Sequence, residues 1–172
     1  SAALGLGLAA VNTRKVFAAN DKVNIACIGV RGRGNSVMHS FADEPEFVDG
    51  SWPVYCVRDT LGAAFHPDLR VPDNARVFDK ATRVEPDAYS GFDGTDLAVW
   101  LHARGVRRVF VCGLATDYCV RATALDAHQA AFETFVIIDA CRAVDQSELS
   151  IDSVLRHLAM AGVSFVDTDH LS

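Results

Sequence analysis

Residues 109–120 read VFVCGLATDYCV, and this stretch decides the fold. It opens with a short apolar run, passes through Gly113 and then enters a segment that we expect to be helical. A continuous apolar run of this length is typical of a strand buried on both faces of a parallel sheet. We therefore predict a strand at 109–112 and a helix from about 117 to 131.

The same alternation of strand and helix continues on both sides of this stretch. Gly105 and Gly162 stand where a helix should stop, and apolar strands that alternate with helices indicate parallel pairing with helices on both faces. The pattern predicts an α/β protein with three layers, α/β/α, around a doubly wound and mainly parallel sheet. The other predicted elements are strands at 76–79, 134–138 and 164–166 and helices at 95–104 and 151–161.

The composition is typical of a globular protein. The chain has 172 residues, of which 50% are hydrophobic and 22% are charged. This length suits one domain that buries roughly 70% of the surface exposed by its unfolded chain. The net charge of -6 argues against a nucleic-acid partner. The apolar run at 2–11 is too short to span a bilayer, so no membrane partner is expected.

The cysteines point to a reducing compartment. Their number, five, is odd and no CxxC spacing occurs, which argues against a disulfide framework and a zinc knuckle. A cytoplasmic location follows, with export as the alternative because the first 20 residues resemble the end of an export leader. Four of the five are expected to be small buried apolar side chains: Cys27, Cys56, Cys112 and Cys141.

Cys119 and Lys80 are the candidate catalytic residues. Cys119 falls in the first turn of the helix that follows strand 109–112, where the helix dipole favours the nucleophilic thiolate. Lys80 follows the predicted strand 76–79, and the carboxyl ends of parallel strands meet at one edge of a sheet. An ammonium beside the sulfur would favour the thiolate further and could transfer a proton. The alternative for Lys80 is a solvated surface cation.

The N-terminal segment carries a different pattern. Residues 23–28 predict a strand that leads into the glycine-rich turn 29–34 and a helix at 36–41, which is the context of a dinucleotide-binding turn. Arg31 stands where such a turn needs its middle glycine. Residues 1–46 resemble the N-terminus of Gfo/Idh/MocA-type oxidoreductases, including the tail of the leader that some of them carry. We therefore expect a leader-like and oxidoreductase-like segment at 1–46 and a second unit at 47–172.

Several motifs of the second unit resemble one family. VCGLATDYCV at 111–120 is similar to the nicotinamidases of the isochorismatase-like cysteine hydrolases, and so are four shorter strings: DGSWPVYC at 49–56, GAAFHPDL at 62–69, FDK at 78–80 and YSGF at 89–92. The resemblance covers about residues 47–170. It implies an isochorismatase-like hydrolase fold whose usual first third is missing, with the atypical strand and helix of residues 1–46 in front of it.

The resemblance implies a catalytic role for four residues. Cys119 would attack a carboxamide and form a thioester, and Lys80 would be the catalytic lysine. The Leu114–Ala115 bond would be a cis peptide, which turns the Ala115 N–H, together with the Cys119 N–H, towards the developing oxyanion.

The resemblance also implies how a substrate would bind. Trp52 would stack on the pyridine ring of nicotinamide, with a core aromatic under a loop as the alternative, and Tyr118 would lie at the edge of the same pocket. Asp117 is expected to support the start of its helix rather than to take part in catalysis.

Two parts of the family's site are missing from this sequence. The family's triad aspartate ends the first strand, where this chain has Ile28 and Gly29. The family normally binds a divalent metal such as zinc or iron, but Tyr55 replaces one metal-binding histidine, and His39 and His66 do not complete a ligand set. We therefore assign no definite cofactor, and we expect the activity to be impaired.

The sequence thus predicts a nicotinamidase-type amidohydrolase of NAD salvage with an impaired site. The alternatives are a related amidase for another small carboxamide, an inactive chimeric module, and an oxidoreductase fragment that binds NAD through residues 29–34. The expected partner is a small-molecule substrate, nicotinamide, and relatives suggest a homodimer.

Overall fold

The computed structural model describes residues 25–28, 59–65, 68–80, 82, 88–145 and 147–171. For residues 25–28 it describes the backbone alone. Several predictions lie outside these ranges: the glycine-rich turn 29–34, the helix at 36–41, and the positions of His39, Trp52, Tyr55, Cys56 and His66. The predicted division at residue 46 lies outside them too and stays a prediction.

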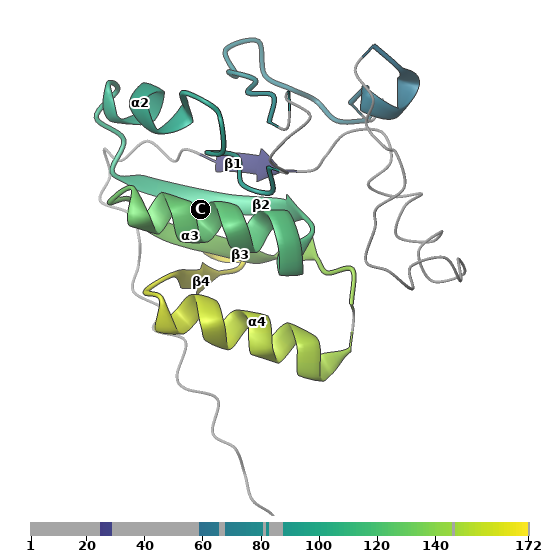
Figure 1. Cartoon of the computed structure of the whole chain (residues 1–172), viewed down its shortest axis with the longest axis vertical. Helices are drawn as coiled ribbons and strands as arrows, with labels where there is room; N and C mark the ends of the chain where they lie inside the picture. The colour runs from purple at the N-terminus through teal and green to yellow at the C-terminus, as the bar shows by residue number, and fades with distance from the viewer. Residues whose placement is uncertain are drawn as a thin grey trace, which may run out of the picture.

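The centre of the fold is a parallel sheet of four strands in the order β1-β2-β3-β4 (Figure 1). The strands are β1 (Ile25–Ile28), β2 (Arg108–Leu114), β3 (Glu133–Arg142) and β4 (Ser164–Val166). Each strand pairs in parallel with the next one along the chain. The predicted α/β class with a parallel sheet is confirmed.

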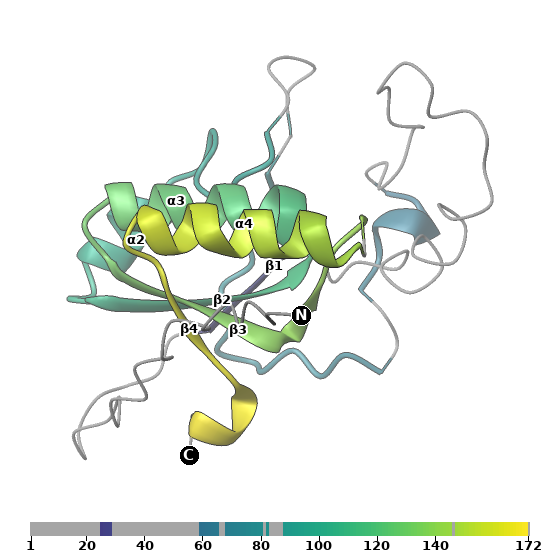
Figure 2. The same ribbon diagram turned by 90° about the horizontal axis from the view of Figure 1, so that it is seen from below.

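Two long helices connect these strands and lie on the same side of the sheet (Figure 2). They are α3 (Arg121–Gln129) between β2 and β3, and α4 (Glu148–Met160) between β3 and β4. A shorter helix, α2 (Leu97–His102), precedes β2. Two 3-10 turns, η2 (Leu61–Ala63) and η4 (Thr168–His170), precede α2 and follow β4 along the chain. No helix among the described residues is both long and apolar enough to cross a membrane.

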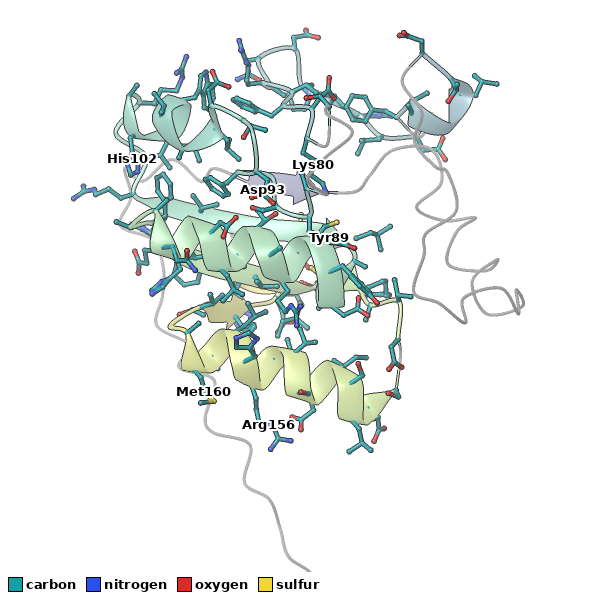
Figure 3. The ribbon with its side chains drawn as sticks, in the orientation of Figure 1. Lys80, Tyr89, Asp93, His102, Arg156 and Met160 are labelled. Carbon is teal, nitrogen blue, oxygen red and sulfur yellow. The ribbon has the colours of Figure 1, made fainter. Side chains whose placement is uncertain are left out.

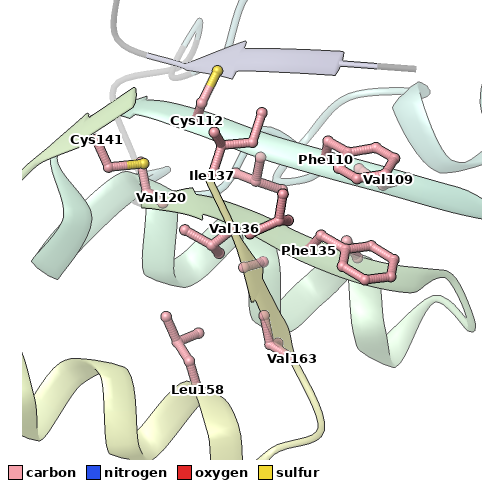
Figure 4. Packing of buried hydrophobic residues seen from close by; sticks show 14 of the residues in the cluster. Val109, Phe110, Cys112, Val120, Phe135, Val136, Ile137, Cys141, Leu158 and Val163 are labelled. Atoms are coloured by element: carbon pink, nitrogen blue, oxygen red, sulfur yellow. The ribbon is translucent and has the colours of Figure 1, made fainter. Parts of the chain in front are cut away.

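The apolar run at 109–112 lies in the centre of the hydrophobic core. Residues 109–113 of β2 are all buried, and Val111, Val136 and Leu158 are each 0% exposed. Figure 4 shows Val136 of β3 and Leu158 of α4 in this packing. Phe110 and Phe135 are directly opposite in the register of β2 and β3 and stack with ring centroids 4.9 Å apart. Burial of each large apolar side chain contributes roughly 1.5 to 3 kcal/mol. This packing fixes the carboxyl end of β2.

Two of the four cysteines expected in the core are found there. Cys112 is 7% exposed and Cys141 is 5% exposed, and no disulfide joins them to one another or to Cys119. The side chain of Cys27 and the position of Cys56 lie outside the described residues.

Two predicted elements differ from the structure. Residues 76–79 form no strand, and Val77 is 46% exposed. A strand needs a neighbour for its ladder of hydrogen bonds, and the described strands pair only with one another. The predicted helix at 117–131 is divided into a π-helical turn, η3 (Thr116–Val120), and α3.

Candidate active site

The site begins where β2 ends. The peptide bond between Leu114 and Ala115 is cis. The Ala115 carbonyl accepts hydrogen bonds from the N–H groups of Tyr118, at 3.1 Å, and Val120, at 3.0 Å. The bond to Val120 spans five residues and is the widened turn of a π-helix, a feature found often at functional sites. The turn holds Cys119, which is partly buried, at the carboxyl end of the sheet.

Lys80 lies against Cys119. Its Nζ atom donates to Cys119 Sγ at 3.2 Å, to the Ala88 carbonyl at 2.9 Å and to the Tyr89 carbonyl at 2.8 Å. These three acceptors match the three N–H donors of an ammonium group. Lys80 is therefore a fixed, partly buried group, and the alternative of a solvated surface cation is wrong. It reaches the site from an irregular segment, not from the strand end that we predicted.

Two tyrosines belong to the segments that hold this pair. The rings of Tyr89 and Tyr118 lie 5.9 Å apart between centroids, with their planes 31° apart. Tyr118 is 38% exposed. Figure 3 shows Lys80 and Tyr89 close together beside the end of β2. The two rings thus form an aromatic pair that is partly open to solvent, from the residue before Cys119 and from a residue whose carbonyl binds Lys80. Trp52, the predicted stacking residue, is outside the described residues.

Asp117 supports a neighbouring turn. Its two carboxylate oxygens each accept one backbone N–H, from Val144 and from Asp145, at 3.0 Å. No side-chain hydrogen bond caps the start of η3. The expectation that Asp117 acts through structure fits this geometry, but the turn that it holds follows β3 and lies 27 residues further along the chain.

The loop that supplies the two carbonyls is tightly bonded. Ser90 is 1% exposed, its N–H donates to Asp93 Oδ2 at 3.1 Å, and its Oγ accepts from the Phe92 N–H at 3.1 Å. The Gly91 N–H donates to Oγ1 of Thr123 in α3 at 2.8 Å. The sequence motif YSGF pointed to this loop without assigning it a role. Its contribution comes from main-chain atoms, which leave no signature in residue type.

Two carboxyl groups close to the carboxyl end of β3 have displaced pKa values. The hydroxyl and N–H of Thr168 donate to the Asp139 carboxylate and lower its pKa. The N–H of Ser147 donates to Asp145 Oδ1 at 2.9 Å and lowers the pKa of that carboxyl. Hydrogen bonds to the charged form of an acid favour that form.

The described residues do not fit a metal ion. No three His, Cys, Asp or Glu side chains among them come together as a ligand set. The three residues compared with the family's metal ligands, His39, Tyr55 and His66, lie outside the described residues.

Comparison with known proteins identifies the fold. The sequence matches the isochorismatase domain over residues 9–169. It is 35% identical over 126 residues to a nicotinamidase of Acinetobacter baylyi, and the alignment covers 70% of this chain and 58% of the relative. The chain thus spans little more than half the length of that curated relative.

Two solved structures are similar to it. One is a pyrazinamidase of Pyrococcus horikoshii in complex with zinc, with a TM-score of 0.64, 34% identity and coverage of 84% of this chain and 73% of the other. The second is PnC1 of L. infantum in complex with nicotinate, with a TM-score of 0.68, 31% identity and coverage of 86% and 73%. These neighbours confirm the predicted isochorismatase-like hydrolase fold.

Proposed function

Because this chain belongs to the isochorismatase family, we propose that it hydrolyses a small planar carboxamide of the nicotinamide type to a carboxylate and ammonia. The observation that carries the proposal is the 3.2 Å hydrogen bond from Lys80 Nζ to Cys119 Sγ. An ammonium that donates to a sulfur stabilises negative charge on it, and a thiolate is the nucleophilic form of cysteine.

The first half of the reaction releases ammonia. The Cys119 thiolate attacks the amide carbon, a C–S bond forms, and the carbonyl electron pair moves to oxygen. The N–H groups of Ala115 and Cys119 stabilise this oxyanion. When the intermediate collapses, the C–N bond breaks, Lys80 protonates the leaving nitrogen, and a thioester remains on Cys119.

The second half regenerates the enzyme. Water attacks the thioester and gives a proton to the neutral Lys80 amine. The C–S bond then breaks, which releases the acid and restores the thiolate beside the ammonium. The balance is one amide and one water consumed for one acid and one ammonia formed.

The aromatic pair supports a planar ring as the substrate. Tyr118 directly precedes Cys119, its ring pairs with that of Tyr89, and the L. infantum neighbour was solved with nicotinate. Offset or tilted ring contacts favour aromatic ligands by about 0.5 to 1.5 kcal/mol beyond the area buried. Trp52 is proposed as a further stacking ring on the strength of the sequence resemblance.

We propose that turnover is slow. The resemblance requires an aspartate at the end of the first strand, and β1 ends at Ile28, which is opposite Gly113 of β2 in the register. A carboxylate at that end would take the proton of the thiol; among the described residues, Lys80 is the group bonded to the sulfur that can transfer a proton. A cytoplasmic location and a homodimer remain proposals from the sequence, as does an oxidoreductase origin of residues 1–46.

Ammonia release from nicotinamide tests the proposal. Purified protein should release ammonia and form nicotinate, while Cys119→Ala should release none. Cys112→Ala, which alters a thiol buried in β2, should retain the rate. Ammonia release that survives Cys119→Ala would contradict the role of Cys119. A panel of other small carboxamides separates nicotinamide from a different amide substrate.

A further inference from the structure

We propose that Thr123 is a positioning residue that sets the distance between Lys80 and Cys119. A catalytic role for this positioning rests on the proposed function. Thr123 lies in α3, four residues after Cys119, and is 0% exposed. Its hydroxyl oxygen accepts the Gly91 N–H at 2.8 Å, so it joins the helical segment that carries Cys119 to the loop at 88–93.

That loop holds Lys80. Gly91 is two residues after Tyr89, and the carbonyls of Ala88 and Tyr89 accept two of the three Lys80 hydrogen bonds. The third goes to Cys119 Sγ. The contacts therefore close a ring from Cys119 along the helix to Thr123, across to Gly91, back to Tyr89 and through Lys80 to the sulfur.

The hydrogen bond between the Gly91 N–H and the Thr123 hydroxyl connects the loop at 88–93 to α3. Without it, the carbonyls of residues 88 and 89 could shift relative to η3, and Lys80 would move with them. The attraction between the ammonium and a negatively charged sulfur weakens as their 3.2 Å separation grows, because the Coulomb energy of two charges falls with distance. Thr123 thus acts on the sulfur through Lys80, without touching it.

Thr95 also bonds Gly91, but it does not connect the loop to α3. Its hydroxyl donates to the Gly91 carbonyl at 2.7 Å, so it contacts the same glycine. Thr95 lies four residues further along the same stretch and therefore braces the loop internally. The bond to Thr123 is what holds the loop at 88–93 in position relative to α3 and Cys119.

Thr123→Val is the central variant, because valine keeps the branched shape and loses the acceptor. Thr123→Ser keeps the acceptor and should rescue the effect. Thr134→Val is the matched control, because Thr134 lies at the amino end of β3, opposite the end where the site lies. Its side chain is 2% exposed, and its hydroxyl donates to the carbonyl of Phe132, just before the strand. Gly91→Ala is the control for the loop, since its added Cβ would meet Thr123 only at 3.6 Å or more and the N–H would remain.

The measurement is the rate at which iodoacetamide alkylates Cys119 in the full chain between pH 5 and 10, followed at that residue by mass spectrometry. This readout needs no substrate. Thr123→Val should slow alkylation at pH 7 by about fivefold or more, the scale of one lost hydrogen bond, and should change the shape of the pH profile. Thr123→Ser, Thr134→Val and Gly91→Ala should each stay within about twofold of the parent protein.

The result that overturns the proposal is a folded Thr123→Val protein with the rate and pH profile of the parent. If valine prevents folding, Thr123→Ala, which places no methyl group against the Gly91 N–H, provides the same comparison. Equal slowing by Thr134→Val would also overturn it, because the effect would then be one of general stability.

Ammonia release separates this inference from the function on which it rests. If the parent chain shows no activity on nicotinamide but Thr123→Val still slows alkylation, the proposed function fails and the positioning role stands. If the parent is active and Thr123→Val changes neither alkylation nor kcat, the function stands and the positioning role fails.

Discussion

Lys80 makes all three of its hydrogen bonds within the site, one to the sulfur and two to carbonyls. Its orientation is therefore set by the protein rather than by solvent. The sequence predicts a lysine near Cys119, and the structure brings the two together. The carbonyl acceptors were beyond sequence reasoning, because every residue type carries a carbonyl and only the path of the chain decides where it points.

Lys80→Gln should reduce ammonia release by about 100-fold or more, because positioned acid–base groups typically contribute factors of this size. Glutamine can still donate to the two carbonyls, so most of the fold should persist. Circular dichroism and steady-state ammonia assays would check both parts. Arg76→Gln is the control, since it removes an exposed cation from the same segment. Equal activity in the two variants would contradict a catalytic role for Lys80.

Asp117 should be sensitive to a change of one atom. Its two oxygens each accept a backbone N–H, whereas the NH₂ of an asparagine would face one of those donors. Asp117→Asn should therefore destabilise the protein by roughly 1 to 3 kcal/mol, measured by urea unfolding. Asp126→Asn, on the adjacent helix α3, serves as the comparison. An unchanged unfolding midpoint for Asp117→Asn would show that this contact contributes nothing to stability.

Among the helices and strands, the sequence pattern predicted best those with a buried apolar face. The predicted strand 164–166 coincides with β4, and the predicted helix 151–161 overlaps α4 except for its first turn, because apolar faces define both. The predicted strand 134–138 covers only the buried first half of β3, which continues to Arg142 through mostly exposed residues. The segment at 76–79 has the composition of a strand but no strand beside it in the described structure. The π-turn of η3 depends on a hydrogen bond over five residues, which residue type does not reveal.

The end of α4 provides a test of local backbone geometry. Gly162 has a φ of +97°, and an added Cβ would lie 2.8 Å from the His128 ring. Gly162→Ala should destabilise the fold by roughly 1 to 2 kcal/mol from the backbone alone, with a further loss from the contact. Gly105→Ala is the matched control, because its φ is +67° and nothing lies within 4 Å.

Urea unfolding of the two variants would separate the backbone contribution from the contact with the His128 ring. The loss for Gly162→Ala should exceed that for Gly105→Ala, and His128→Ala in the Gly162→Ala background should recover the difference. Equal losses in the two single variants would mean that the His128 ring moves aside without cost.

For the whole molecule, the strands follow one another across the sheet in chain order, and the last turn is tied back to the sheet. Asp139 in β3 accepts from Thr168 in η4, and the pKa of this carboxyl is lowered below its ordinary value of 3.8. A lowered folded-state pKa adds stability that is present above the unfolded value and is lost as pH falls through the folded value.

The unfolding free energy should therefore decrease as the pH falls below 3.8, and Asp139→Asn should show a weaker decrease. Asp145→Asn should behave in the same way, because the pKa of Asp145 is also lowered. Thermal unfolding between pH 2.5 and 7 would test this, with Asp73→Asn as an exposed control. A pH dependence in Asp139→Asn identical to that of the parent would contradict the role of the Thr168 contact.

The carbonyl groups that hold Lys80 have a consequence for how the protein can vary. Because the acceptor at position 88 is an oxygen that all twenty amino acids possess, a library randomised at Ala88 should keep the lysine in place across many substitutions. Positions 80 and 119 would tolerate almost none. Variation at 88 would therefore look neutral in a mutational scan even though its oxygen holds the lysine beside the sulfur.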